Sequence, residues 1–400
     1  MVIIVGSGAG GGLLAMEFAL ANIPVLLIEK GPFINSGEAF KYYDESDEDI
    51  DLLKTTCIGG STLVSTGNSV RVLEDVFSSL GIDLSNEFEE VEKLLKVHKL
   101  DDSHHGTSSK LFIEAASKLD LNPIKMPKAI NEKKCIICGN CAFGCPEDAK
   151  WSSKDFVEIA KDNGANIITN TEVFDLIIEN SEIKGVKALN NSGEIQEFKS
   201  DLVILSAGAI GSAKILQNAG IKAGEKLFID PFVTIGGILK DSKLNSEIQM
   251  NALVQGKNFI LSPHYSTIIY NEFKDKGVKS SDIFSIMVKI PDERKGYIKD
   301  DKIVKFNSLR DVEYIAEGSA VAAYILKEVG VDPNSIKSTN IRGAHPGGSA
   351  AIGEIVDINL QTEIKGLYVS DASVLPVAPG MPPIITILAL SKRLAKHLIK

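Results

Sequence analysis

Four of the chain's five cysteines lie in one short run, and their spacing is the clearest chemical signal in the sequence. The run reads C-x2-C-x2-C-x3-C-P and comprises Cys135, Cys138, Cys141 and Cys145, followed by Pro146. Thiolate sulfur is the ligand that iron–sulfur clusters and zinc prefer. The spacing is that of the bacterial ferredoxin run for an iron–sulfur cluster. We therefore expect these thiols to bind a cluster and to pass single electrons.

Other uses of these thiols stay open at this point. Structural zinc commonly pairs two close cysteines with two distant ligands, and disulfides are rare in the cytosol. In two-cluster ferredoxins the fourth cysteine of a run binds the other cluster, but this chain has no second run. We favour one [4Fe-4S] cluster on all four thiols, with a three-iron cluster or a ligand from Cys57 as alternatives. Cys57 itself is expected to be a small buried residue.

The start of the chain predicts a dinucleotide-binding turn. Residues 2–5 are an apolar run typical of a buried parallel strand. The sequence Gly6-x-Gly8-x-x-Gly11 follows, and Glu29 stands about twenty residues further on, as in the dinucleotide fold. Gly6 would form the tight turn, Gly8 would admit the pyrophosphate to the backbone, and Gly11 would allow close packing. Phosphates would then face the amino end of a helix, and Glu29 would accept a hydrogen bond from a ribose. The alternative is a glycine turn that serves packing alone.

A second glycine-rich loop at 58–68 and a late segment at 366–371 favour FAD over NAD. A cofactor with its own reactive ring needs contacts from distant parts of the chain. With these stretches the chain resembles the glucose-methanol-choline (GMC) oxidoreductase family of flavoproteins, as a variant with a ferredoxin-like four-cysteine motif. The matching stretches are 6–11, 59–71, 206–216, 345–353, 366–376 and 383–395.

The resemblance implies roles for individual residues. His345 resembles the active-site histidine over the flavin, and imidazole is well suited to take an alcohol proton near pH 7; a structural histidine is the alternative. Val173 would contact the adenine through its backbone, Asp371 and Ala372 the pyrophosphate and ribityl chain, and Pro383 and Ile384 the pyrimidine end of the flavin. The cofactor-binding residues expected in all are Gly6, Gly8, Gly11, Glu29, Gly60, Ser61, Thr62, Val173, Ala207, Gly208, Asp371, Ala372, Pro383 and Ile384.

The chain departs from the family at three points. Most members carry a second His or Asn just before the proline of the last motif, where this chain has Pro382, which has no side-chain donor. The family's Asn-Gly in the early glycine-rich loop is Ser65-Thr66 here. The chain is also short, which implies a small substrate section.

The resemblance and the cysteine run together predict an FAD-dependent dehydrogenase. A CH–OH group of an alcohol, polyol or sugar-like substrate would lose its proton to His345 and a hydride to flavin N5. Single electrons would pass through the cluster to an external redox protein such as a ferredoxin-like carrier. An oxidase would need no cluster. The alternatives are a reductase that runs the same steps backwards, an electron-transfer flavoprotein subunit of a larger complex, and a non-redox lyase-type enzyme.

The elements that must position these residues define an α/β fold, α+β overall. We expect a Rossmann-like FAD-binding domain at 1–225 and 339–400, a cysteine-rich loop inserted at 126–153, and an antiparallel-sheet substrate or cap domain at 226–338. The expected helices are 13–21, 86–100, 108–119, 154–163, 310–329 and 384–399. The expected strands include 25–29, 201–206, 247–254, 259–270, 283–290 and 366–371.

Composition narrows the range of partners and locations. A net charge of −10 argues against nucleic acid and anionic membrane surfaces. No 18-residue apolar run and no signal peptide are found, so we expect a cytoplasmic protein without a membrane span. Of the other histidines, His104 and His105 are expected in a solvated loop and His397 on the surface, while His264 is undecided.

Overall fold

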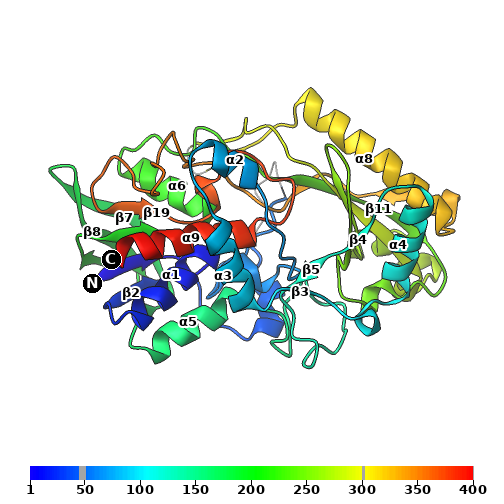
Figure 1. Cartoon of the computed structure of the whole chain (residues 1–400), viewed down its shortest axis with the longest axis horizontal. Helices are drawn as coiled ribbons and strands as arrows, with labels where there is room; N and C mark the ends of the chain where they lie inside the picture. Colours follow the sequence, from blue (N-terminus) through cyan, green and yellow to red (C-terminus); the bar gives the residue numbers. More distant parts are fainter. Residues whose placement is uncertain (45–50, 300–301, 400) are drawn as a thin grey trace.

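A parallel sheet of five short strands forms one end of the molecule (Figure 1). The computed structural model describes residues 1–44, 51–299 and 302–399. Along the sheet the strands are β19 (Leu367–Val369), β10 (Val203–Leu205), β1 (Val2–Val5), β2 (Val25–Ile28) and β6 (Asn166–Ile168). All neighbouring pairs run parallel. Every residue of β1, β2, β10 and β19 is buried, because both faces of the sheet are covered, and this explains their unbroken apolar sequences.

Helices and a small antiparallel sheet cover this parallel sheet. Helix α1 (Ala9–Leu20) packs against α5 (Ser153–Asp162) and α9 (Ile384–Leu398), and α3 (Ser85–Leu95) packs against α9. Figure 1 shows α1 and α9 lying together near both chain ends. The small sheet, with order β7-β8-β9, contacts β2, β10 and the helix α6. Its strands are β7 (Thr171–Glu179), β8 (Glu182–Asn190) and β9 (Ile195–Lys199), and α6 is Gly208–Asn218.

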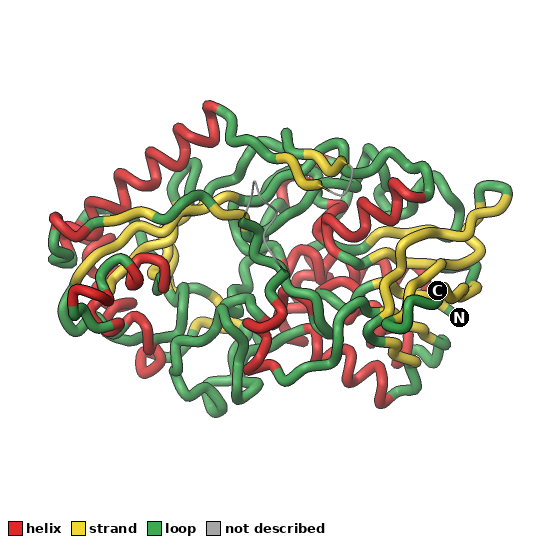
Figure 2. The backbone as a smooth tube through the Cα atoms, turned by 180° about the vertical axis from the view of Figure 1, so that it is seen from behind, coloured by secondary structure: helices red, strands yellow, loops and turns green. Residues whose placement is uncertain are grey.

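A seven-stranded sheet forms the other end of the molecule, as Figure 2 shows from behind. Its order is β17-β11-β14-β13-β12-β4, with β18 paired to β11, and all its pairs are antiparallel. The strands are β4 (Ile124–Lys125), β11 (Pro231–Ile238), β12 (Ala252–Gln255), β13 (Ile260–Pro263), β14 (Ile283–Lys289), β17 (Lys337–Ser338) and β18 (Arg342–Gly343).

The two faces of this sheet have different neighbours. One face carries Val233, Ile286 and Val288 and packs with the helices α4 (Thr107–Lys118) and α8 (Leu309–Glu328). The opposite face carries Phe232, Met287 and other residues of a separate apolar cluster. Alternation along antiparallel strands places successive side chains on opposite faces. Segments from the other half of the chain pack against this second face through Leu53, Val70, Ala344 and Met381.

The remaining elements are short and lie mostly in connecting segments. They are η1 (Ser36–Tyr42), η2 (Gly60–Leu63), α2 (Glu74–Ser79), β3 (His98–Lys99), η3 (Asp102–His104), β5 (Pro127–Lys128), η4 (Leu244–Ser246), α7 (Thr267–Asn271), η5 (Lys274–Lys276), η6 (Ser280–Asp282), β15 (Tyr297–Lys299), β16 (Lys302–Val304), η7 (Pro333–Ser335) and η8 (Ala372–Val374).

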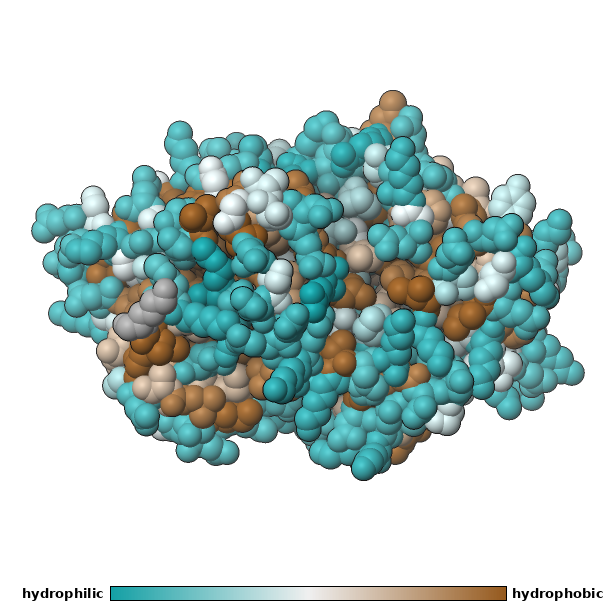
Figure 3. Space-filling model, in the orientation of Figure 1, coloured by the Kyte–Doolittle hydropathy of each residue, from teal (hydrophilic) through white to brown (hydrophobic). Residues whose placement is uncertain are grey.

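The surface is largely hydrophilic, with apolar side chains in scattered patches on the face that Figure 3 shows. Among the described residues, no helix is both long enough and apolar enough to cross a membrane.

The predicted fold class is confirmed, with three local differences. The expected helix at 86–100 ends at Leu95, because Lys96 takes a left-handed conformation with φ +54°, and His98–Lys99 form β3. The expected strand at 259–270 is right only for β13, because Ser266 accepts a hydrogen bond from Ile269 N and begins the helix α7. Of the expected strand at 247–254, only the part from Ala252 onward is in β12. The predicted division into domains stays a prediction; β4 and β18 of the larger sheet come from outside 226–338.

The packing between α4 and the larger sheet predicts a difference between two phenylalanines. Phe112 on α4 is 0% exposed and lies in the core cluster, whereas Phe306 is 74% exposed. We expect Phe112→Ala to lower the free energy of unfolding by about 3–5 kcal/mol, because it leaves a cavity. The matched variant Phe306→Ala should change it by less than about 0.5 kcal/mol. Urea unfolding followed by circular dichroism measures both, and equal effects would contradict the assigned packing.

Candidate functional site

The glycines in the turn between β1 and α1 differ in whether a side chain would fit at their positions. Gly6 has φ +94°, and a Cβ there would lie 2.4 Å from the carbonyl oxygen of Ser206. A Cβ on Gly11 would lie 2.0 Å from the carbonyl oxygen of Gly6. Gly8 is different, since a Cβ on it would meet no atom closer than 4.0 Å. The fold requires Gly6 and Gly11 for packing, while the backbone of Gly8 is open to a neighbour from outside the chain.

The second glycine-rich loop lies directly across from Gly8. Gly60 begins η2 with φ +53°, and a Cβ on it would point at the Cα of Gly8, 3.4 Å away. Thr62 Oγ1 donates to Gly59 O and accepts from Ser153 N at 2.9 Å. Ser153 Oγ in turn donates to Gly8 O at 2.8 Å. Gly8 and Gly60 therefore face each other without side chains at the amino end of α1, where the helix dipole favours phosphate.

Glu29 follows β2 at the same edge of the sheet and holds the turn in place. Its carboxylate accepts hydrogen bonds from Ser7 N at 2.9 Å, Ser7 Oγ at 2.6 Å and Gly31 N at 2.9 Å. Burial raises the pKa of Glu29, and these hydrogen bonds oppose the rise. The backbone of Lys30 is a further hydrogen-bond partner of this carboxylate, so Glu29 holds together the backbone of the turn and of the segment after β2.

Asp371 follows β19 and, like Glu29, holds the neighbouring backbone by accepting hydrogen bonds. Its Oδ2 accepts from Gly208 N at 2.9 Å and from Ser212 Oγ at 2.6 Å, and its Oδ1 accepts from Ser373 N at 2.8 Å. The ends of β10 and β19 are adjacent because these strands pair in parallel. The structure thus brings Ala207, Gly208, Asp371 and Ala372 to the same sheet edge as Gly6 and Glu29.

The other predicted cofactor residues lie on elements that border this edge. Val173 is buried on β7, which begins beside Glu29, since Thr171 N donates to Glu29 O at 3.0 Å. Pro383 precedes the first turn of α9, and Ile384 begins it. Ser61 Oγ accepts from Thr55 N and thereby fixes the loop at 55–61. Their contacts with a cofactor stay predictions.

His345 lies in a second site, between the two sheets. Its Nδ1 is 3.0 Å from Oδ2 of Asp230, and the two side chains are 19% and 0% exposed. Oδ1 of Asp230 accepts from Gly380 N at 2.9 Å. Burial holds the pKa of His345 well below its usual value, and the nearby Lys289 lowers it further. The ring is therefore neutral at pH 7; with its proton on Nδ1 toward Asp230, the nitrogen that can accept a proton is Nε2.

Lys289, the last residue of β14, completes this site. It is 2% exposed, and its Nζ lies 3.2 Å from both Nδ1 and Nε2 of His345. Burial lowers the pKa of Lys289 to about 8, while the Asp230 carboxylate opposes the fall. Burial also raises the pKa of Asp230, and Lys289 opposes that rise. Asp230, His345 and Lys289 thus form a buried group of an acid, a base and an ammonium ion.

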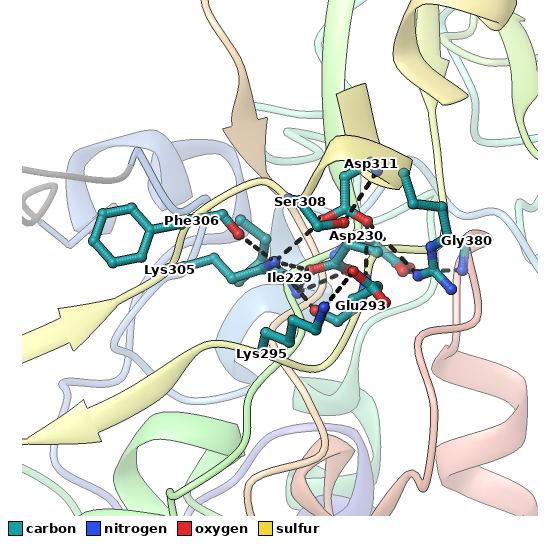
Figure 4. A network of polar contacts seen from close by, with 11 residues as sticks. Ile229, Asp230, Glu293, Lys295, Lys305, Phe306, Ser308, Asp311 and Gly380 are labelled. Carbon is teal, nitrogen blue, oxygen red and sulfur yellow. Dashed lines mark hydrogen bonds and ion pairs between the residues drawn. The ribbon is translucent and has the colours of Figure 1, made fainter. Parts of the chain in front are cut away.

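A buried charge network holds Asp230 in position (Figure 4). Oδ1 of Asp292 accepts from Asp230 N at 2.9 Å, and Oδ2 of Asp292 lies 3.0 Å from Lys305 Nζ. Lys305 also lies 3.6 Å from Asp311, which caps the amino end of α8 together with Ser308. All three charged side chains are at most 1% exposed. The network ties the start of α8 to the backbone beside the catalytic candidate.

The sheet face around Lys289 carries further polar groups. Phe232 pairs in register with Lys289 on one side and Arg342 on the other, and the two cations lie 5.6 Å and 5.9 Å from its ring centre. Arg342 forms an ion pair with Asp51. His264, undecided from the sequence, follows β13 on this face, and burial lowers its pKa to about 4, with further lowering by Arg342 and Lys289. Its Nδ1 has no hydrogen-bond partner among the described residues.

The four cysteines of the run line a single pocket. Gly139 and Gly144 shape it; both have positive φ, and a Cβ on either would lie 2.0 Å from a carbonyl oxygen of the surrounding chain. Burial raises the pKa of Cys135, and the other three thiols raise it further. All five cysteines are free thiols. Within the described residues, however, no group of three or more His, Cys, Asp or Glu side chains is arranged to hold a metal ion.

Two buried lysines stand between this pocket and the glycine-rich loop at 58–68. Lys128 is 0% exposed and donates to Thr66 O, Asn68 Oδ1 and Gln249 O at 2.5–2.9 Å. Lys150 is 4% exposed and donates to Thr62 O and Leu63 O at 3.0 Å and 3.1 Å. Burial lowers the pKa of both, to about 7 for Lys128, and the Cys141 thiol is the leading opposing influence. Their hydrogen-bond acceptors are carbonyl and amide oxygens. The groups that favour their charged forms are thiols of the pocket and, for Lys150, also Asp155 and Asp148.

Outcomes for the other candidates are mixed. The solvated loop predicted at His104 and His105 is wrong, because His105 is 3% exposed and both its ring nitrogens are buried. Glu247 accepts from Ser108 N and Ser109 N, which draws the start of α4 inward. Cys57 is buried and His397 is exposed, as expected.

Sequence reasoning missed Asp230, Lys289, Lys128 and Lys150. Lys289 did leave a signal, since it is the one charged residue of a strand that is apolar apart from Ser285. Asp230 left none, because its role depends on pairing across the sheet.

The fold and the two sites define a protein with a dinucleotide-binding fold and a buried acid–base site. Comparison with known proteins identifies its family. Two models of the GMC oxidoreductase family match the chain, one at residues 9–244 and one at residues 302–391. The chain belongs to the GMC oxidoreductase family, and this membership supports FAD as its cofactor.

Relatives match over nearly the whole chain. An uncharacterized protein of Methanocaldococcus jannaschii is 35% identical over 401 residues, with 99% of each chain covered. Long-chain-alcohol oxidase FAO3 of Arabidopsis thaliana is 23% identical, covering 99% of this chain and 68% of the oxidase. Among solved structures, pyridoxine 4-oxidase from Mesorbium loti has a TM-score of 0.75 at 16% identity, with 99% and 98% covered. Formate oxidase has a TM-score of 0.75 at 16% identity, with 99% and 97% covered. The two structures share the fold.

The contrast between Gly8 and Gly11 gives a test of the cofactor site. We expect Gly8→Ala to fold normally but to lose most of its bound flavin, because the added methyl group fills the space left for phosphate. Gly11→Ala should instead lower the thermal midpoint, because its Cβ would overlap Gly6 O. Flavin absorbance per chain and thermal unfolding measure the two effects. Full flavin content in Gly8→Ala would show that the phosphates lie elsewhere.

Proposed function

We propose that this protein is an FAD-dependent oxidoreductase that acts on a CH–OH group of an alcohol, polyol or sugar-like substrate. The observation that carries the proposal is the buried contact between His345 and Asp230 at 3.0 Å. A histidine oriented by a buried carboxylate is a general base held in one tautomer. In support, proteins named as oxidases of long-chain alcohols and of pyridoxine are similar to this chain.

His345 would take the hydroxyl proton at Nε2. Because its pKa is well below the usual value, the ring is neutral and ready to accept a proton throughout the physiological range. Asp230 would stabilise the imidazolium that forms. Bound FAD supplies the hydride acceptor for this chemistry.

The residues at the sheet edge would hold FAD. Gly6, Gly8, Gly60 and the amino end of α1 would receive the pyrophosphate, and Glu29 would accept a hydrogen bond from a ribose hydroxyl. Ser61, Thr62, Ala207, Gly208, Asp371 and Ala372 border the same space, with Val173 at the adenine end and Pro383 and Ile384 at the flavin end. Gly11 would contribute through packing.

An electron-transfer subunit with a degenerate pocket is the competing function. A buried carboxylate and a buried ammonium each cost several kcal/mol unless they are well paired. Asp230 and Lys289 are both held at His345, at 0% and 2% exposure. A site maintained at this energetic cost favours catalysis in this chain over a vestigial pocket.

We further propose that the four cysteines bind a [4Fe-4S] cluster that passes single electrons to an external redox protein. The support is the shared pocket of Cys135, Cys138, Cys141 and Cys145, together with the two buried lysines beside it. Buried ammonium groups need a compensating anion, and a thiolate-ligated cluster would provide one. Ligation would require the four thiols to converge on the pocket that they line. Ile136 at 61% exposure and Phe143 at 40% would offer a carrier an apolar contact.

His345 gives the direct test of the catalytic proposal. We expect His345→Ala to slow anaerobic bleaching of the bound flavin by 1-octanol or benzyl alcohol by about 10²–10⁴-fold. Its flavin content should equal that of the wild type. The control is His397→Ala, because His397 is exposed on α9. Stopped-flow absorbance measures the rates, and a variant that bleaches as fast as the wild type would refute the base role.

Iron and sulfide analysis tests the cluster. Anaerobically purified wild type should contain about four iron and four sulfide per chain, and Cys138→Ser should lose most of both. The control Cys57→Ala should keep them, because Cys57 lies outside the pocket. A full iron content in Cys145→Ser would show that another residue is the fourth ligand. Zinc in place of iron, or no metal at all, would rule out the proposed transfer of electrons through a cluster.

A further inference from the structure

Lys289 differs from the other buried lysine of the same region in what it contacts. Lys305 is 1% exposed on its side chain and is fully engaged, with Asp292 at 3.0 Å, Asp311 at 3.6 Å, Glu293 O at 3.1 Å and Phe306 O at 3.0 Å. The hydrogen-bonding contacts of Lys289 in the described structure are the two ring nitrogens of His345, both at 3.2 Å. Lys305 has the surroundings of a structural residue, and Lys289 does not.

We propose that Lys289 is a second catalytic residue, whose ammonium group holds the substrate oxygen beside His345 while that oxygen loses its proton. The proposal rests on the proposed function, in which His345 is the base.

Hydrogen-bond capacity supports this role. An ammonium group has three donors and no acceptor. Nδ1 of His345 already donates to Asp230, so Nε2 has the single lone pair that can accept, either from Lys289 or from a substrate hydroxyl. When a hydroxyl takes the place of Lys289 at Nε2, all three donors of Lys289 are left for other acceptors next to that nitrogen. The hydroxyl then meets a donor for its oxygen and an acceptor for its proton.

Lys289 lies on a sheet face that combines apolar and polar side chains. It pairs in register with Phe232, and the same face carries Met287, Ile260 and Leu253 of one apolar cluster. Apolar walls with a few convergent polar groups are typical of small-molecule sites. The opposite face of the sheet is covered by α4 and α8.

The step balances with the groups named. In the oxidative direction the O–H bond breaks and the proton passes to Nε2 of His345. The C–H bond breaks as a hydride leaves with its electron pair to the bound FAD, which the proposed function names as acceptor, and a carbon–oxygen double bond forms. Lys289 keeps its protons throughout and stabilises the negative charge that develops on the oxygen.

The first test compares Lys289→Met with Lys289→Arg in the flavin-loaded protein. With 1-octanol or benzyl alcohol, we expect Lys289→Met to lower the limiting rate of anaerobic bleaching about 100-fold or more. The alcohol concentration at half-maximal rate should change much less, because the interaction is strongest in the transition state. Lys289→Arg should restore part of the rate. A purely structural lysine would instead give proportional losses of flavin and of thermal stability, with no rescue of the rate by arginine.

The pH profile provides a second readout. The titratable and charged groups near Lys289 are Asp230, His345, His264 and Arg342, and the pKa of Lys289 is about 8. The ammonium form is present below that pKa and is lost above it, so the wild-type rate should fall above about pH 8. This limb should be absent in Lys289→Met. His345 adds no limb between pH 7 and 9, because its pKa lies well below 6.5.

A third readout does not depend on turnover. Benzoate and octanoate carry an oxyanion like that of the activated alcohol, and we expect them to perturb the flavin spectrum of the oxidised wild type. Lys289→Met should weaken their binding at least tenfold, and Lys289→Arg should retain most of it.

The outcomes separate the two proposals. Normal bleaching and anion binding in Lys289→Met, together with an impaired His345→Ala, would overturn the role of Lys289 alone. Unimpaired His345→Ala, or no bleaching of the wild type by either alcohol, would overturn the proposed function and the role of Lys289 with it.

Discussion

The pairing of buried charges is the constraint on which the rest of this structure depends. Asp230 is fully buried and would be unstable there without compensation. Its carboxylate contacts His345 and Gly380 N, and its backbone is held by Asp292, which in turn pairs with Lys305. The chain around Asp230 can therefore adopt few other arrangements. The orientation of the candidate base follows from that restriction.

The same constraint connects the two ends of the molecule. Lys305 and Asp311 fix the start of α8, which packs on the sheet face that carries Val233 and Ile286. The network from these two residues extends to Asp230, just before β11. Lys128 and Lys150 connect the cysteine pocket to the glycine-rich loop through carbonyl oxygens of that loop. An anionic group in the pocket would complete their surroundings in the way that carboxylates complete those of Lys305. The proposed cluster and the proposed cofactor site are thus joined by contacts within one set of loops.

Local sequence was enough to predict the parallel strands, most helices and the glycine turn. Residues 2–5 and 203–205 are apolar throughout because both faces of their sheet are covered, and such runs are visible without a structure. His345 was predicted from its motif. Lys289 and Asp230 were not, because Lys289 reaches the site only through the register of β14 with β11, and Asp230 only through the connection before β11. The start of α4, two residues after His105, is likewise held by Glu247, which is far away in the sequence. Periodicity and residue spacing carry no information about contacts that depend on long-range strand pairing.

The central claim is that oxidation of a hydroxyl compound at His345 feeds single electrons to the cysteine pocket. The most direct measurement is electron paramagnetic resonance of samples frozen at intervals after anaerobic mixing of the flavin-loaded, iron-containing protein with an alcohol that bleaches it. The account predicts that a reduced-cluster signal grows as the flavin bleaches in the wild type. In His345→Ala the signal should be absent after alcohol but present after dithionite. A flavin that bleaches fully while neither alcohol nor dithionite produces a cluster signal would contradict the account.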